Sequence, residues 1–251
     1  MAGKNPGRDL DARLTRIRRP WILAVGTTVF LACATAAAQS RTPFQARCED
    51  TIGESVSVLS STQGGYRIDN TRSFHDLTRL KGRVRPGSWV LGLTHTDARI
   101  SIKVGGRILQ DPASGYECVA PRVEVMLAYQ PIVVYVSREF PPASCAYREV
   151  LGHEMRHLTT YQDFLPQAEE RLRAALAARF GGKPLYARSG QARDLLQREV
   201  DRSWMPFIKR EMAGVEVLQA AIDTPQEYAR LGKVCAGEVK SLLTPARRSS
   251  S

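Results

Sequence analysis

Apolar and polar residues alternate in short runs through the first part of the chain. Between residues 39 and 142 these runs are separated by pairs such as Gly64-Gly65 and Pro86-Gly87, a pattern typical of strands joined by turns. In residues 99–104 every second residue is apolar, as in a strand with one face in water. We therefore expect a β-rich region, with strands that include residues 88–94, 98–104, 117–127 and 132–136.

From residue 143 onward, apolar residues recur at helical spacing. Ser144 follows two prolines closely and is a suitable N-cap for the first helix. We expect this helix to be interrupted at Pro166, because proline lacks a backbone donor and clashes with the preceding turn, and to resume over residues 168–180. A second helix should span about residues 191–222, and a third should run from the capping sequence at 224–227 to about residue 242.

These patterns predict an α+β protein. The β-rich region, residues 39–142, should pack on the helical region, residues 143–251. The chain from residue 39 to residue 251 is short enough to form one compact domain.

The N-terminal residues 1–38 have the composition of an export signal. A basic segment precedes the apolar run 21–38, and Ala36 to Ala38 supply small residues for cleavage. The alternatives are an uncleaved anchor in the inner membrane, for which the run is only marginally long, and lipidation at Cys33. We expect an exported protein of the periplasm or the extracellular space.

The formal net charge of +11 changes this picture little. The basic residues are spread along the chain and no nucleic-acid-binding motif is present, so we expect no nucleic acid as a partner. We expect contact with a membrane only through the N-terminal segment.

Four cysteines lie outside that segment, an even number that suits a compartment permitting disulfides. Cys118 begins a predicted hairpin whose second strand ends shortly before Cys145, so we expect these two to pair. That leaves Cys48 to pair with Cys235, although four cysteines allow three pairings and buried free thiols are the alternative.

The sequence HEMRH, residues 153–157, carries the candidate chemistry. On a helix, His153 and His157 share one face, and this face is otherwise apolar. Burying two imidazoles without a shared partner is costly, and one metal ion would serve both. The alternative is a pair of core histidines that are hydrogen-bonded to backbone groups or carboxylates.

This H-E-x-x-H segment resembles the motif of the zincin metallopeptidases. The resemblance implies a zincin-like fold, Zn²⁺ held by His153 and His157, and Glu154 as the general base that takes a proton from a water molecule. In zincins a sheet edge beside the motif helix often holds the substrate, and the strand at 132–136 is a candidate for that role. The third histidine of the metzincins and the glutamate segment of other zincins are absent, so the subfamily stays open.

A catalytic zinc site needs a third protein ligand, and Glu211 is our candidate. If the helices on either side of residue 185 fold back on each other, His157 faces about residue 213. Glu211 is the only charged member of an apolar stripe on the second helix, whereas Glu216 lies off it. The alternatives are an ion pair between Glu211 and an arginine such as Arg156, or a helix break near Pro206 that rotates the stripe.

We therefore expect an exported, zinc-dependent metallopeptidase that cleaves peptide bonds, with a peptide or protein as its substrate. One alternative is a zinc amidase that acts on peptidoglycan. The other is a non-catalytic protein of the cell envelope in which the metal site is structural or vestigial.

Overall fold

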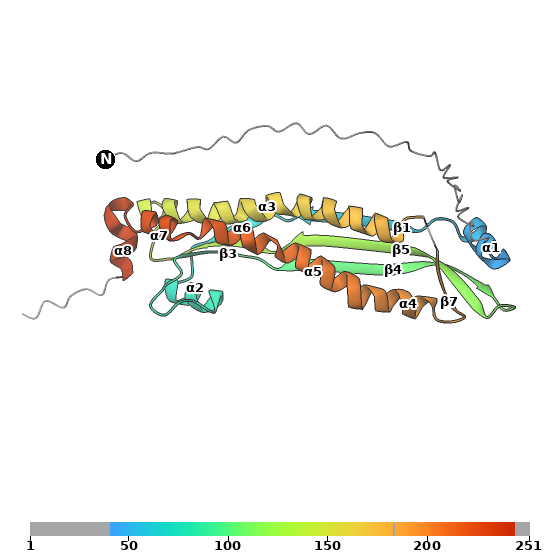
Figure 1. Ribbon diagram of the computed structural model, residues 1–251. Coiled ribbons are helices and arrows are strands. Elements are labelled where there is room, and N and C mark those ends of the chain that lie inside the picture. The colour runs from blue at the N-terminus through green and yellow to red at the C-terminus, as the bar shows by residue number, and fades with distance from the viewer. Residues whose placement is uncertain (1–40, 183, 244–251) are drawn as a thin grey trace, which may run out of the picture. The chain divides into compact units, whose positions relative to one another are not determined.

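The computed structural model of the protein describes residues 41–182 and 184–243. Strands lie mainly in the first half of the described chain and helices in the second, so the protein is mixed α and β as expected (Figure 1). The predicted export signal at residues 1–38, with Cys33, lies outside the described residues.

The longest pairing is an antiparallel hairpin of β4 (Ala98–Asp111) and β5 (Tyr116–Tyr129). On the other side of β5, its second half pairs in parallel with β1 (Val56–Gln63), and its first residues pair with β7 (Leu185–Arg188). This first sheet therefore has the order β1-β5-β4, with β5 at its centre.

A second sheet has the order β2-β6-β3 and consists of β2 (Tyr66–Asp69), β6 (Ile132–Val136) and β3 (Gly92–His95). Strands pair with both edges of β6, and all five of its residues are buried because helices cover the two faces of this sheet. The strand predicted at residues 132–136 is thus present, but it is central and not a sheet edge. β3 is the edge strand that contacts the helix carrying the histidines.

The two sheets follow one another along the same strands. Gln63 lies opposite Tyr129 at the end of the first sheet, and Tyr66 lies opposite Ile132 at the start of the second, so the parallel register continues across the break. Gly64 and Gly65 fill the gap on one strand.

Helix α3 (Cys145–Phe180) has 36 residues and contacts both sheets. Ser144 caps its N-terminus, as predicted, by accepting a hydrogen bond from the Tyr147 backbone at 3.1 Å. The predicted interruption at Pro166 is wrong. Proline cannot donate to the carbonyl of Gln162 one turn earlier, but the Gln63 side-chain amide donates to that oxygen at 2.8 Å. A tertiary contact therefore replaces the missing helical hydrogen bond.

The predicted helix over 191–222 is a nearly continuous series of helical segments. The segments are α4 (Ala192–Glu199), a π-helical turn (Val200–Trp204), α5 (Met205–Ala213) and α6 (Val215–Ile222). Thr224 caps α7 (Pro225–Leu231) with proline at the first helical position, as predicted. The last predicted helix does not run unbroken to residue 242, because a short 3-10 turn (Cys235–Gly237) separates α7 from α8 (Glu238–Leu243).

Two short helices lie in the half that the sequence analysis assigned to strands. They are α1 (Pro43–Ile52) and α2 (Phe74–Lys81). Each begins with a capping box, formed by Thr42 with Gln45 and by Ser73 with Asp76. This local signal is visible in the sequence and predicts both helix starts.

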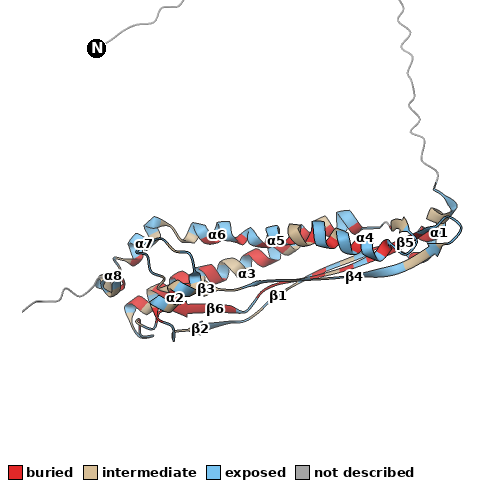
Figure 2. Cartoon of the chain, turned by 90° about the horizontal axis from the view of Figure 1, so that it is seen from below, coloured by how far each residue is buried: buried red, intermediate tan, exposed pale blue. Residues whose placement is uncertain are grey.

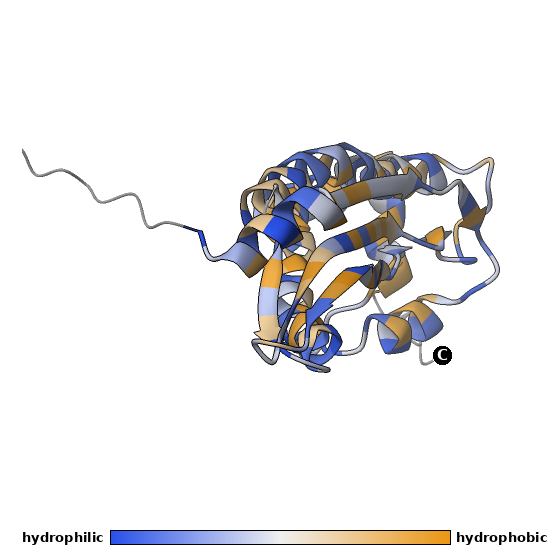
Figure 3. Cartoon of the chain, turned by 90° about the vertical axis from the view of Figure 1, so that its right-hand side faces the viewer, coloured by the Kyte–Doolittle hydropathy of each residue, from blue (hydrophilic) through white to orange (hydrophobic). Residues whose placement is uncertain are grey.

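The main core lies between one face of the first sheet and the two rows of helices, α3 and α4–α6. Leu127 on β5, Leu172 on α3 and Ile208 on α5 are fully buried there. In Figure 2 the buried residues colour β6 and the inner side of α3 red, and in Figure 3 hydrophobic residues appear on both the strands and the helices. The opposite face of the first sheet includes exposed Val56, Val58 and Met126.

The two disulfides differ from the predicted pairs. Cys48 pairs with Cys118, and Cys145 pairs with Cys235. Cys118 lies at the beginning of β5, and the strand carries the chain roughly 35 Å away from it at about 3.3 Å per residue before the chain turns toward Cys145. Cys118 instead packs against the unpredicted helix α1, which carries Cys48.

No helix in the described part of the chain is long and apolar enough to cross a membrane.

Gly106 and its neighbour Gly105 provide a test of the hairpin packing. Gly106 has φ +148°, and a Cβ at this position would overlap the Ala120 carbonyl oxygen, whereas a Cβ at Gly105 would meet no atom within 4 Å. We predict that Gly106→Ala lowers the free energy of unfolding by about 1–3 kcal/mol. Gly105→Ala should stay within about 0.5 kcal/mol of the wild type. Urea unfolding of both variants checks this, and equal values would contradict the packing described for the hairpin.

Candidate metal centre

Helix α3 buries all three motif residues. His153, Glu154 and His157 are 5%, 4% and 8% exposed, although each is polar. Their faces of α3 contact β3 of the second sheet and helix α6. Buried polar groups of this kind require partners, and the partners come from both neighbours.

Asp223, directly after α6, meets both histidines. Its Oδ1 lies 3.1 Å from His153 Nε2 and 3.2 Å from His157 Nε2, and the two Nε2 atoms lie 3.2 Å apart. These three residues are the one group in the described part of the chain whose side-chain atoms could together hold a metal ion. Two imidazole nitrogens and one carboxylate oxygen thus converge on one point.

The spacing of these atoms fits a tetrahedral zinc ion. Ligand atoms at about 2.0–2.1 Å from zinc in tetrahedral geometry lie about 3.3 Å from one another. The observed separations of 3.1–3.2 Å match that edge within a few tenths of an ångström. Three protein ligands with a fourth position open is also the composition of catalytic zinc sites. The residues therefore fit a zinc ion in both chemistry and spacing.

The charges at the group favour a cation. Burial raises the pKa of Asp223, but hydrogen bonds from His153, His157 and Tyr228 outweigh it and hold the pKa below its usual range. Burial lowers the pKa of His157, yet its contacts with Asp223 and Gln219 leave that pKa raised. Asp223 is therefore a carboxylate at neutral pH and supplies the negative charge that a metal site needs.

Gln219 on α6 fixes the ring of His157. The Gln219 Oε1 atom accepts a hydrogen bond from His157 Nδ1, and the Gln219 amide donates to the His157 backbone oxygen at 3.1 Å. With Nδ1 as the donor to Gln219, Nε2 is the ring nitrogen that faces His153 and Asp223 and the one that would bind a metal ion. Gln219 is buried, and this two-point contact is typical of the outer shell of a metal site.

Glu227 on α7 lies beside the other histidine. Its Oε1 lies 3.3 Å from His153 Nδ1, and it also accepts hydrogen bonds from Arg156 and Arg230. Hydrogen bonds from Arg230 and the neighbouring charges lower the pKa of Glu227 to about 2. Arg156 Nη2 is 2.9 Å from the same ring nitrogen. When His153 binds a metal through Nε2, its Nδ1 carries the proton and Glu227 is the acceptor placed to receive it.

Glu154 points toward β3. The Thr94 hydroxyl lies 3.0 Å from Glu154 Oε2 and 2.9 Å from the Glu154 backbone oxygen. Burial raises the pKa of Glu154, while the two histidines and Thr94 act in the opposite direction. A raised pKa suits a group that takes up and releases a proton near neutral pH.

The structure does not bring Glu211 to the group. Its Oε2 accepts a hydrogen bond from Arg171 at 3.1 Å, and the arginine considered as its partner, Arg156, pairs with Glu227. The buried residues of α5 are Ile208 and Met212, so Glu211 lies off the buried face, and the point about which the helices fold back lies a few residues beyond residue 185. His157 therefore faces Gln219 instead of residue 213.

The sequence contains a signal for Asp223 that the choice of Glu211 did not take into account. Asp223 lies between the end of one predicted helix and Thr224, the predicted cap of the next. A carboxylate at such a junction is fixed by two helix ends, whereas Glu211 was chosen only from residues within a helix. His75, on the exposed side of α2, and His95, at the end of β3, take no part in the group.

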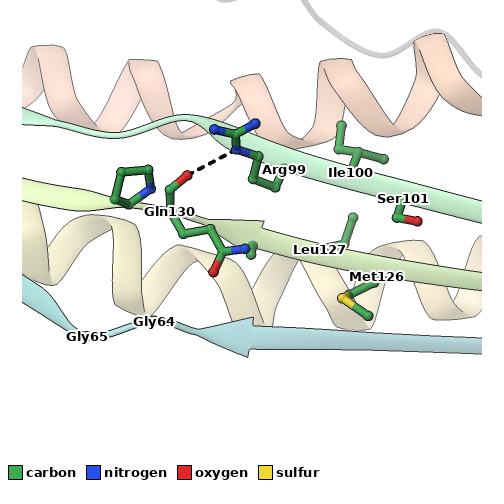
Figure 4. Close-up of a pocket in the computed structure, with 10 residues that line it drawn as sticks. Gly64, Gly65, Arg99, Ile100, Ser101, Met126, Leu127 and Gln130 are labelled. Carbon is green, nitrogen blue, oxygen red and sulfur yellow. Dashed lines mark hydrogen bonds between the residues drawn. The ribbon is translucent and has the colours of Figure 1, made fainter.

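A groove lies on the first sheet near its junction with the second, apart from the histidines (Figure 4). Arg99 and Gln130 line it, joined by a hydrogen bond from Arg99 Nε to the Gln130 backbone oxygen at 3.2 Å. Gly64, Gly65 and Met126 complete its visible wall. None of the residues that line it belongs to the metal-ligating group.

Comparison of the chain with models of known families, with curated proteins and with solved structures finds no match. The geometry of the histidine group is therefore the basis for any statement about function.

The C-terminal strap, which we define as residues 223–243, carries Asp223 and Glu227 and is attached to the start of α3. Cys235 is bonded to Cys145, and Arg230 pairs with Glu149 at 2.7 Å. Buried Val239 packs in a small cluster with residues of β6 and α3. The strap has little other buried apolar surface, so the disulfide carries much of its attachment.

Replacing Asp223 tests the ligand set. We predict that Asp223→Ala lowers zinc affinity by more than the roughly 10–100-fold that loss of an outer partner costs. Glu211→Ala should leave zinc affinity unchanged. Competition titration against a zinc indicator measures both, with circular dichroism to verify folding. A loss with Glu211→Ala and none with Asp223→Ala would restore the original ligand choice.

The two disulfides should differ in their effect on the metal centre. Cys145→Ser/Cys235→Ser should weaken zinc binding, because the strap that carries Asp223 is released from α3. Cys48→Ser/Cys118→Ser removes a bond that joins α1 to β5. It should lower stability by about 2–5 kcal/mol and keep zinc affinity. Zinc titration and urea unfolding of both pairs of variants check this; equal zinc affinities in the two would show that the strap is held by other contacts.

Proposed function

We propose that the protein is an exported, zinc-dependent hydrolase of the zincin type that cleaves peptide bonds. The observation that carries the proposal is the convergence of His153, His157 and Asp223 with Glu154 buried beside them. A structural zinc site needs the ligands alone. A buried carboxylate with a raised pKa at the same place is what general acid–base chemistry requires.

The proposed roles follow from the contacts of each residue. His153, His157 and Asp223 would hold the ion, while Gln219 and Glu227 orient the two rings. A zinc ion bound there would supply Lewis acidity to a carbonyl group and to a water molecule. Glu154 accepts the proton of the attacking water and passes it to the leaving amine as the peptide bond breaks.

β3 is the proposed support for the substrate. It is an edge strand of the second sheet in the described chain, and it contacts α3 beside Glu154. An extended peptide can add to such an edge through main-chain hydrogen bonds. This assigns to β3 the role that the sequence analysis considered for residues 132–136.

The proposed compartment is the periplasm or the extracellular space. Two disulfides join residues far apart in sequence, and such bonds persist in oxidising compartments. The N-terminal composition supports the same assignment.

Peptidoglycan contains amide bonds between amino acids, so an amidase of the cell wall would use the same atoms.

A non-catalytic protein with a structural metal site is the second candidate. The depth of the two histidines, 5% and 8% exposed, favours it, because structural zinc sites are closed to solvent. Asp223, with a side chain 30% exposed, is the ligand through which the group reaches the surface. The two candidate functions differ in the role of Glu154, which is the general base in the hydrolase and has no catalytic role in the structural site.

Glu154→Gln separates them. For the hydrolase we predict that the variant binds zinc as the wild type does and loses peptide hydrolysis by about 10²–10⁴-fold, because the amide cannot accept the proton. The assay uses a fluorogenic peptide library on zinc-loaded protein. Wild-type protein that binds one zinc and hydrolyses no member of the library would favour the structural site. A variant that retains activity would show that Glu154 is not the general base.

A further inference from the structure

From the contacts of β3, we infer that Thr94 is a positioning residue for Glu154: its hydroxyl fixes the direction of the carboxylate. The effect of Thr94 on catalysis rests on the proposed hydrolase function. The contact between Thr94 and Glu154 does not depend on that function.

The Thr94 hydroxyl lies within hydrogen-bond distance of two oxygens of Glu154, between which its single proton is shared. The distances are 3.0 Å to the side-chain Oε2 and 2.9 Å to the backbone oxygen. The contact with the backbone oxygen holds the Thr94 hydroxyl against helix α3, next to the Glu154 carboxylate. The contact with Oε2 favours one orientation of that carboxylate. Burial leaves this carboxylate 4% exposed, so water does not compete freely for it.

Gly92 lies against the other oxygen of the same carboxylate. A Cβ at Gly92 would lie 2.6 Å from Glu154 Oε1 and 2.6 Å from Val150 Cγ1. Glu154 therefore fits only because position 92 has no side chain. One oxygen lies against a glycine backbone and the other faces a hydroxyl, which leaves the carboxylate little freedom to rotate.

The alternation of β3 explains why these two residues act together. Gly92 and Thr94 are two apart in a strand and so share the face toward α3. Leu93, between them, packs on the opposite face with Leu77 of α2. The second sheet is thus covered by α2 on one face and by α3 on the other, and this fixes β3 relative to the catalytic helix.

Three single variants separate the hydroxyl from the methyl group of Thr94. Thr94→Val keeps the shape and removes the hydroxyl, while Thr94→Ser keeps the hydroxyl. Thr96→Val is the matched control, because the Thr96 hydroxyl is buried and has no hydrogen-bond partner in the described chain. The readouts are kcat and KM for peptide hydrolysis and the zinc content of each protein.

We expect Thr94→Val to lower kcat by roughly tenfold to a hundredfold, the range for losing a hydrogen bond to a charged group, with KM and zinc content unchanged. Thr94→Ser should restore most of the activity, and Thr96→Val should resemble the wild type. If Thr94 served only for packing, Val would be the active variant and Ser the impaired one. That order, or a Thr94→Val protein as active as the wild type, would overturn the inference.

A double-mutant cycle on stability keeps the inference separate from the proposed function. In zinc-free protein, Thr94→Val should lower the free energy of unfolding when residue 154 is Glu. The loss should be smaller in the Glu154→Ala background, where only the contact with the backbone oxygen of residue 154 remains. This measurement needs no catalysis. If the wild type has no hydrolytic activity, the proposed function fails, but the double-mutant cycle can still be interpreted. Equal losses in both backgrounds would show that the Thr94 hydroxyl makes no contact with the Glu154 side chain.

Discussion

The burial of ionisable groups on α3 is the constraint on which the arrangement of the second half depends. An uncompensated charge or lone pair in this position costs several kcal/mol, so each group must meet a partner. Asp223 meets His153 and His157, Gln219 meets the far side of one ring, and Glu227 meets the other. The positions of α6 and of the strap, which includes α7, give each of these buried groups its partner.

The local pattern of the sequence predicted much of the fold and one part of the site. Strand alternation located β4, β5 and β6, capping residues located the starts of α3 and α7, and helical spacing placed His153 and His157 on one face. These features depend on residues close in sequence, where spacing fixes geometry.

The errors concern contacts between distant residues. Pro166 should end a helix by its own chemistry, but Gln63 supplies the missing donor from a strand about one hundred residues earlier. The third ligand was placed at Glu211 because an unbroken helical stripe was assumed, whereas a π-helical turn precedes α5 and the buried residues there are Ile208 and Met212. The cysteine pairs failed because Cys48 lies on a helix that the strand pattern concealed. Periodicity gives the facing side of an element, and only the full topology gives what it faces.

The metal-ligating group has a consequence for the order in which the chain can fold. Asp223 is separated from His153 by 70 residues and from His157 by 66, and the connection includes β7 and the four helical segments from α4 to α6. Contacts of such separation form late, because the loop entropy must be overcome first. A chain that lacks the strap, or has not yet docked it, has two histidines without their carboxylate. A metal ion held by all three residues would be captured only as the fold is completed.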